Sequence, residues 1–489
     1  MSVSTRPFPQ DFLFGAATAA FQIEGAAHED GRRDSIWDVF CRVPGAVLGG
    51  DDGTVACDHY HRYRDDVALM KRLGLDTYRF SVSWARVRPD GGALNPAGLD
   101  FYKCLVDELR DADILPWLTL YHWDLPQALQ ERGGWTSRET ADRFTEYALD
   151  VHDALGDRVN VWTTLNEPWC ASFLSYTGGE HAPGHTSIEE GLLASHHLLL
   201  AHGQTVRALR GRDASLDLGI TLNHTVADPA DPQNAADVDA ARRVDGQFNR
   251  WFLDPIHRAS YPADIVEDIR AVDAAAVASF EAAIFDGDLD TIAQPIDTQG
   301  VNYYHGDFVA GAPQEHPPVS GGPATTRPGR SPYPSDAGIH AVERGLPRTS
   351  QNWEVQPEGL TRLLRRLSDE YTGAKGVRLF VTENGAAYDD VVTDGEVHDD
   401  ERVEYVRAHL GAVLDAVDAG VDVRGYFYWS LMDNFEWAWG YDKRFGIVRV
   451  DYDTQERTPK DSALEYARII AARELDAAAV SSGPVASRM

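Results

Sequence analysis

The sequence predicts an α/β protein and, within that class, a single (β/α)8 barrel of the TIM type. Eight short runs rich in β-branched and aromatic residues alternate with longer stretches in which apolar residues recur every three or four positions. This alternation is typical of parallel strands joined by helices. Polar side chains also gather at the ends of these runs, where a barrel places its site. With 489 residues, 43% of them apolar, the chain can bury such a core.

The strands are predicted from runs of mostly β-branched, aromatic and aliphatic residues. In chain order these runs cover residues 12–25, 77–84, 115–123, 159–168, 216–225, 297–304, 377–384 and 423–431. The stretches between them have helical apolar spacing, as in YRDDVALMKRLG and PEGLTRLLRRLSDEYTG. Because the strand ends of a barrel form one rim, the polar residues near the ends of the runs are expected to share one pocket. These residues are Gln22, Arg79, His122, Asn166, Glu167, Asn223, Asn302, Tyr304, Glu383 and Trp429.

The barrel is expected to form one domain over residues 1–472, followed by a disordered tail over residues 473–489. A Pro- and Gly-rich stretch at residues 306–350 is too long for a plain connection. It is either a flexible surface insertion or a lip over the barrel mouth. We favour the lip because loops at that face of a barrel carry function.

Composition argues against several classes of partner. With 45 Lys and Arg against 77 Asp and Glu, the net charge of −32 repels nucleic acid and anionic membrane surfaces. We find neither a long apolar span nor a leader with a basic start and an apolar centre. The four Cys are scattered without a CxxC pair. We therefore expect a cytoplasmic protein with reduced thiols and no cofactor, and the sequence leaves open whether it forms a homo-oligomer.

Two glutamates end predicted strands that should meet at the same rim. Glu167 follows Asn166 in TLNEPW, and Glu383 stands in VTENG. A carboxylate that ends an apolar run is costly to bury without a partner, so a functional role is favoured over a solvated or capping one. Two carboxylates facing one pocket are what glycosidic bond hydrolysis requires: one is a proton donor, and the other attacks or stabilises a cationic sugar. A separation of about 5–5.5 Å would give retention and roughly 6.5–9.5 Å inversion, and the sequence does not decide between them.

Neighbouring side chains are expected to separate the two roles. If Arg79 and Tyr304 converge on Glu383, charge and hydrogen bonding keep that carboxylate ionised. A drier wall near Glu167 would instead raise its pKa. The two glutamates would then differ in protonation at one pH.

Further residues are candidates for holding a sugar, because hydroxyl groups need planar hydrogen-bonding partners and the C–H face of a sugar needs an aromatic surface. Gln22, His122, Asn166 and Glu436 are candidates for the former, and Trp429 and Trp437 for the latter. For any single Trp here, a place in an aromatic core is an equally good interpretation. Metal binding is not indicated, since no second His stands at a ligand spacing from His122 on the same element.

Taken together, these motifs resemble glycoside hydrolase family 1, the β-glucosidase family, over roughly residues 7–470. The resemblance rests on FLFGAATAAFQIEGA, DHYHRYRDDVALMKRLGLDTYRFSVSWARV, TLYHWDLPQALQ, TLNEPW, GVNYY, VTENG and YFYWSLMDNFEWAWGYDKRFGIVRVDY. It implies a retaining mechanism in which Glu167 is the general acid/base and Glu383 is the nucleophile that forms a glycosyl-enzyme.

The resemblance also implies roles for the surrounding residues. Tyr304 would contact the nucleophile, and Arg79 would lie beside it. Trp353, in NWEVQPEG, would line the aglycone entrance, with Trp169 a further candidate there. The residues implied to bind the sugar are Gln22, His122, Asn166, Asn302, Trp429, Glu436 and Trp437.

The implied activity is exo-acting hydrolysis of terminal β-D-glucosyl residues from β-glucosides and cello-oligosaccharides. β-Galactosidase or β-fucosidase side activity and transglycosylation are options. Glu436 and Trp437 favour a neutral sugar over a phosphorylated one, and Glu167 in place of a glutamine favours O-glycosides over thioglucosides. The chain departs from the family pattern at Gln356, where an aromatic is common, which puts the aglycone preference in doubt, and at Glu465, where a Trp often stands.

Two other classes of function are weaker. A non-catalytic sugar-binding barrel is disfavoured because both glutamates are present. A barrel lyase or isomerase would need a metal or phosphate site, and no motif for either is found.

Overall fold

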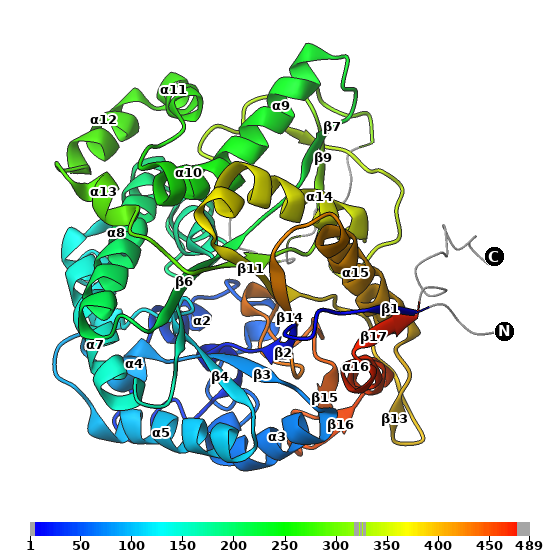
Figure 1. Ribbon diagram of the computed structural model, residues 1–489. Helices are drawn as coiled ribbons and strands as arrows, with labels where there is room; N and C mark the ends of the chain where they lie inside the picture. The colour runs from blue at the N-terminus through cyan, green and yellow to red at the C-terminus, as the bar shows by residue number, and fades with distance from the viewer. Residues whose placement is uncertain (1–4, 317–321, 323–324, 326–328, 477–489) are drawn as a thin grey trace.

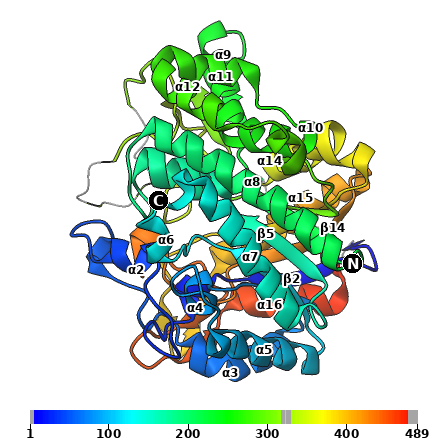
Figure 2. The same ribbon diagram turned by 90° about the vertical axis from the view of Figure 1, so that its left-hand side faces the viewer.

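The computed structural model of the chain describes residues 5–316, 322, 325 and 329–476 (Figure 1). Eight parallel strands close into a barrel. Helices lie around it, as the two views in Figures 1 and 2 show. The barrel strands are β2 (Leu13–Ala17), β3 (Thr77–Ser81), β4 (Leu115–Tyr121), β5 (Val161–Asn166), β6 (Asp217–Asn223), β8 (Thr298–Asn302), β11 (Arg378–Asn384) and β14 (Val423–Trp429). They follow chain order around the barrel, and β14 pairs with β2 to close it. The predicted fold class is confirmed.

Each predicted run contains one barrel strand, but the first run, residues 12–25, extends well beyond its strand. Strand β2 ends at Ala17, and Ala20–Ile23 forms a helical turn, α1. The chain leaves the barrel wall here because the Ala20 N–H donates to Ser81 Oγ, at 2.7 Å, instead of continuing a ladder. Gln22 therefore sits on a helical turn above the strand end and not on the strand itself.

The long helices lie on the outside of the barrel and bury their apolar faces against it. In α5 (Pro96–Asp111), for example, Pro96 opens the helix and Leu105, Val106 and Leu109 are buried. The other long helices are α3 (His59–Leu73), α7 (Arg138–Leu155), α8 (Ile188–Arg212), α14 (Pro357–Leu367), α15 (Asp400–Asp418) and α16 (Asp461–Ala472). Shorter helices are α2 (Ile36–Cys41), α4 (Trp84–Val87), α6 (Gln127–Gln130), α9 (Ala235–Asp245), α10 (Trp251–Arg258), α11 (Ala263–Val272), α12 (Ala274–Ala283) and α13 (Asp288–Ile292).

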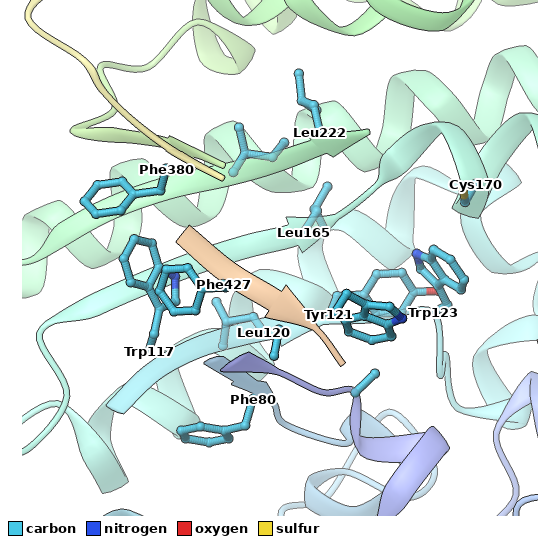
Figure 3. Packing of buried hydrophobic residues seen from close by; sticks show 14 of the residues in the cluster. Phe80, Trp117, Leu120, Tyr121, Trp123, Leu165, Cys170, Leu222, Phe380 and Phe427 are labelled. Carbon is cyan, nitrogen blue, oxygen red and sulfur yellow. The ribbon is translucent and has the colours of Figure 1, made fainter. Parts of the chain in front are cut away.

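Aromatic side chains fill the barrel interior away from the polar rim. Trp117 packs edge-on against Phe380 and Phe427, with ring centroids 4.8 Å and 5.1 Å apart. These three rings form an aromatic plug in the barrel. Gly15 makes room for this plug, because an added Cβ would lie 2.6 Å from the Phe427 ring. In Figure 3 these three rings group at one end of the strands, and Cys170 lies toward the other. The filled end leaves the C-terminal end of the barrel as the place for a cavity.

The stretch at residues 306–350 is more structured than a flexible insertion. Within it, β9 (Asp307–Ala310) pairs with β10 (His340–Ala341) and with β7 (Ala227–Pro229) to form a small sheet. Residues 317–321, 323–324 and 326–328 of this stretch lie outside the described residues.

The first residues of the predicted C-terminal tail are ordered. Glu474–Asp476 forms β17, which pairs antiparallel with β1 (Thr5–Pro7) and buries Leu475. Figure 1 shows these two strands side by side where the ends of the described chain meet. Ordered chain thus continues past residue 472, and residues 477–489 lie outside the described residues. Further short strand pairs are β12 (Val392–Thr393) with β13 (Glu396–Val397) and β15 (Val448–Val450) with β16 (Arg457–Pro459).

In the part of the chain that the structure describes, no helix combines the length and apolarity that a membrane crossing would need.

A buried ionic cluster ties together the loops that follow β11 and β14. Lys460 Nζ donates to Asp433 Oδ1 at 2.8 Å and also to Asp390. Arg402 donates to Asp390 Oδ1 at 2.9 Å and also to Asp399. All five side chains are almost completely buried. Each carboxylate therefore depends on these cations for the interactions it loses with water.

Replacing Lys460 by Met is expected to destabilise the fold strongly. The substitution leaves Asp433 and Asp390 buried with less compensating charge, and breaking such a pair costs about 3–5 kcal/mol. Lys103→Met is the matched control, because its ion pair with Asp100 is exposed and contributes about 1 kcal/mol at most. Urea unfolding of both variants measures the difference. Equal unfolding midpoints for the two variants would contradict the role of the cluster.

Candidate active site

Glu167 directly follows the last residue of β5, at the C-terminal rim of the barrel. Its backbone adopts a left-handed conformation, with φ at +46°, and its N–H donates to Thr221 O of the adjacent strand at 3.0 Å. The side chain is only 5% exposed, and both of its oxygens have partners. Oε1 accepts a hydrogen bond from Asn302 Nδ2 at 2.7 Å, and Oε2 accepts one from Cys170 Sγ at 3.1 Å. The strand end thus fixes the backbone, and two donors fix the carboxyl group.

Glu383 stands near the end of β11 and is 3% exposed. Arg79 Nη1 donates to its Oε1 and Tyr304 Oη donates to its Oε2, both at 2.7 Å. The predicted convergence of Arg79 and Tyr304 on Glu383 is therefore present. A cation and a hydroxyl group both favour the charged form of this carboxylate.

A hydrogen-bond network joins the two glutamates. Arg79 Nη2 donates to Asn166 Oδ1 at 2.7 Å, and Asn302 Nδ2 lies 3.2 Å from the same oxygen. Asn166 Nδ2 in turn lies 3.0 Å from His122 Nε2. Since Asn302 also bonds Glu167, the network runs from Glu383 through Arg79, Asn166 and Asn302 to Glu167.

The two carboxyl groups differ in what surrounds them. Burial raises the pKa of Glu167 to about 8, and the negative charge of Glu383 adds to this, against the hydrogen bonds from Asn302 and Cys170. Burial also raises the pKa of Glu383, against the charge of Arg79 and the hydrogen bond from Tyr304. Arg79 and Tyr304 thus favour the charged form of Glu383, as expected from the sequence, while burial opposes them. Between the two, Glu383 contacts the cation, so the proton belongs on Glu167.

Most of the predicted site residues line one cavity of about 390 Å³ at the barrel rim. Those lining it are His122, Glu167, Trp169, Asn223, Asn302, Tyr304, Trp353, Glu383, Trp429, Glu436 and Trp437. Arg79 and Asn166 are buried and act through the network rather than from the cavity wall. Gln22 is also buried and donates to Phe435 O at 2.7 Å, beside Glu436.

Flat rings form much of the cavity wall. The His122 ring lies 5.6 Å from Trp429 and 5.9 Å from Trp437, with interplanar angles of 22° and 20°. Beside them, burial raises the pKa of Glu436 to about 8, and the charges of Glu383 and Glu167 add to this. The wall combines hydrogen-bonding groups with apolar faces, which is what a sugar ring requires.

Several residues of the cavity were not predicted. They include Trp123, Cys170, Glu180, His181, His224, Phe248, Tyr333, Gln351 and Trp439. Cys170 could have been found from its spacing, since a residue three positions after Glu167 lies on the same side if the chain turns into a helix there. Phe248 and Tyr333 carry no such signal. Their rings lie 4.3 Å and 5.9 Å from Trp169, and they come from distant segments of the chain.

The described part of residues 306–350 contributes Asp307, Gly322, Pro332 and Tyr333 to the cavity wall. This supports the interpretation of the stretch as a lip over the barrel mouth.

The two departures from the family pattern lie away from the cavity. Gln356 is buried, and its carbonyl oxygen accepts a hydrogen bond from Tyr303 Oη at 2.9 Å. Glu465 pairs with Arg407 and Arg468, each at 2.8 Å. Neither residue is part of the cavity wall.

Among the described residues, no group of three or more His, Cys, Asp or Glu side chains is placed to hold a metal ion. The site instead offers two buried carboxyl groups, one of them paired with a cation, in a cavity of hydrogen-bonding groups and aromatic faces. On a TIM barrel, this combination defines a glycoside hydrolase.

The comparison with known proteins gives the family. The profile of glycosyl hydrolase family 1 matches residues 4–475. The chain is 50% identical over 465 residues to thermostable β-glucosidase B of Thermobispora bispora, covering 95% of this chain and 90% of that protein. It is 47% identical over 478 residues to the bifunctional β-D-glucosidase/β-D-fucosidase of Bifidobacterium breve, covering 96% and 99%. The crystal structure of the psychrophilic β-glucosidase from Micrococcus antarcticus matches with a TM-score of 0.91 and 55% identity, over 96% of this chain and 98% of that one. The chain belongs to glycosyl hydrolase family 1, which confirms the resemblance.

Glu167→Gln is expected to stabilise the fold at neutral pH. Burial raises the pKa of Glu167 from 4.5 to about 8, so between these values the folded chain keeps a proton that the unfolded chain releases. The free energy of unfolding of the parent therefore falls as pH rises through this window. In the Gln variant it does not fall for this reason, because glutamine does not titrate. Its melting temperature should exceed that of the parent by a few degrees at about pH 7.5, with a smaller gain near pH 4.5.

Glu465→Gln is the control with the opposite sign. Burial alone would raise the pKa of Glu465. Hydrogen bonds from Arg468 and Arg407 outweigh burial and lower this pKa to about 2. Its ionised form contributes stability above about pH 4.5, so the Gln variant should melt below the parent at neutral pH. If Glu167→Gln also melts below the parent at about pH 7.5, the raised pKa of Glu167 is wrong.

Proposed function

We propose that the protein is a retaining, exo-acting β-glucosidase that releases terminal β-D-glucosyl residues from β-glucosides and cello-oligosaccharides. The observation that carries this proposal is the asymmetric surroundings of two buried glutamates. Glu383 contacts Arg79 and Tyr304, whereas Glu167 accepts hydrogen bonds from the neutral groups Asn302 and Cys170. The relatives named above are β-glucosidases, which supports the same assignment.

In the first step, the ionised Glu383 attacks the anomeric carbon and forms a glycosyl ester. Glu167 donates its proton to the glycosidic oxygen as that bond breaks, so the leaving group departs as a neutral alcohol. Arg79 and Tyr304 hold Glu383 in the charged form that attacks, and they keep its orientation.

In the second step, water attacks the ester. Glu167, now ionised, takes a proton from that water, and Glu383 leaves as a carboxylate. A sugar hydroxyl group in the place of water would give transglycosylation by the same route.

The sugar is expected to lie against Trp429, with its hydroxyl groups on Gln22, His122, Asn166, Asn302, Glu436 and Trp437. A neutral glucosyl group suits this wall, because Glu436 can hydrogen-bond hydroxyl groups and no Lys or Arg is among the described residues that line the cavity. β-Fucosidase side activity is included because one relative is named for it. The aglycone would leave past Trp353 and Trp169, which line the cavity.

Glu383→Ala is expected to reduce hydrolysis of an aryl β-glucoside by about 10⁴-fold or more, because the attacking carboxylate is removed. Added azide should enter the vacated space and restore part of the turnover, giving the α-glycosyl azide. Product analysis distinguishes this outcome from contamination by a second enzyme, which would give glucose alone. Unchanged activity of the variant would refute the assignment of Glu383.

Tyr304→Phe is expected to shift the acidic limb of the pH profile of kcat/KM upward by about one unit. Loss of the hydroxyl donor disfavours the ionised form of Glu383, so its pKa rises and activity is lost at a higher pH. The basic limb, which Glu167 sets, should move less. Tyr303→Phe is the matched control, since its hydroxyl group contacts Gln356 instead. Identical profiles for both variants would argue against this role of Tyr304.

A further inference from the structure

Cys170 lies directly against the carboxyl group of Glu167. It opens the helical segment η3 (Cys170–Gly178), three residues after Glu167, and its Sγ is 3.1 Å from Glu167 Oε2. The side chain is buried and lines the cavity. A thiol is a weak donor and a weak acceptor, so it can serve either protonation state of its neighbour.

The direction of the thiol is set from its other side. Asn223 Nδ2, at the end of β6, donates to Cys170 Sγ at 3.6 Å. Burial raises the pKa of Cys170 far above its ordinary value, so the sulfur keeps its proton. With a lone pair of the sulfur facing Asn223, the S–H is free to point at Glu167 Oε2.

Asn302 decides which oxygen of Glu167 carries the proton. Its Oδ1 accepts from the Thr382 hydroxyl at 2.8 Å, which turns Nδ2 toward Glu167 Oε1 at 2.7 Å. An amide N–H donates and cannot accept. Oε1 therefore stays an acceptor, and the proton of the neutral acid belongs on Oε2, the oxygen beside Cys170.

We infer that Cys170 is a positioning residue for the acid/base, whose thiol donates to Glu167 Oε2 when Glu167 is ionised and accepts from it when Oε2 carries a proton. The thiol keeps its own proton throughout and takes no part in the bond changes. This role rests on the proposed function. It would let one glutamate act as acid in the first step and as base in the second without an unpaired buried oxygen in either state.

The test compares Cys170→Ala with Cys170→Ser in the pH profile of kcat/KM for an aryl β-glucoside. Alanine removes both contacts, but the hydrogen bond to the ionised carboxylate is the stronger one. The basic limb should therefore move up by about half a pH unit, while the acidic limb stays in place. Serine can donate and accept, so it should bring the basic limb back toward the parent. A basic limb that Ala leaves unmoved, a shift of both limbs together, or a Ser variant that behaves like Ala would overturn the inference.

A second measurement does not depend on turnover. Infrared difference spectra can follow the carboxyl C=O stretch of protonated Glu167, identified by its loss in Glu167→Gln, as pH is raised. The midpoint should shift up by about half a unit in Cys170→Ala. It should stay in place in Cys41→Ala, which removes another buried thiol, on α2. If the parent hydrolyses no β-glycoside, the proposed function fails, and this titration still decides whether Cys170 tunes Glu167. An unchanged midpoint in Cys170→Ala overturns the inference.

Discussion

The contact between the Arg79 guanidinium and Glu383 is the interaction on which the site depends. Glu167, Glu383 and Glu436 are three of the carboxyl groups that line the cavity, and burial raises the pKa of each. Of these three, Glu383 bonds Arg79 directly. Like charges close together disfavour one another, so the group beside the cation is the one that ionises. The ionisation of Glu383 then disfavours ionisation of the other two.

The barrel makes this arrangement possible because it supplies rigid positions for polar groups that would be costly elsewhere. Arg79 and Asn166 project from neighbouring parts of one rim, while the aromatic plug around Trp117 fills the interior behind it. The loops that follow β11 and β14 are tied by the buried cluster of Lys460 and its partners. The loop after β14 carries Glu436 and Trp437, so this cluster supports one wall of the cavity from outside.

Much of the fold and of the catalytic pair could be predicted because local rules govern both. Runs of β-branched and aromatic residues identified all eight barrel strands, and the position of a carboxylate at a strand end identified Glu167 and Glu383. The end of β2 was missed because a tertiary contact, Ala20 N–H to Ser81 Oγ, ends the strand. Phe248 and Tyr333 were missed because they contact Trp169 only when segments far apart in the sequence fold over the rim. Cys170 looked like a plain reduced thiol, because its partner oxygen becomes apparent only when the chain turns after Glu167.

The features that make Glu167 an acid also make it a burden on the fold. A carboxyl group held at 5% exposure among neutral donors stays protonated near neutral pH, where an exposed one would be charged. Because the folded chain keeps this proton, its free energy of unfolding falls as pH rises. Other parts of the structure must therefore supply the stability that the site costs. The packed barrel interior and the paired buried charges provide it, since apolar side chains pack closely there and the charges of the cluster around Lys460 are matched by opposite ones. The polar rim can therefore hold an unfavourable proton because the rest of the barrel supplies the stability that this proton costs.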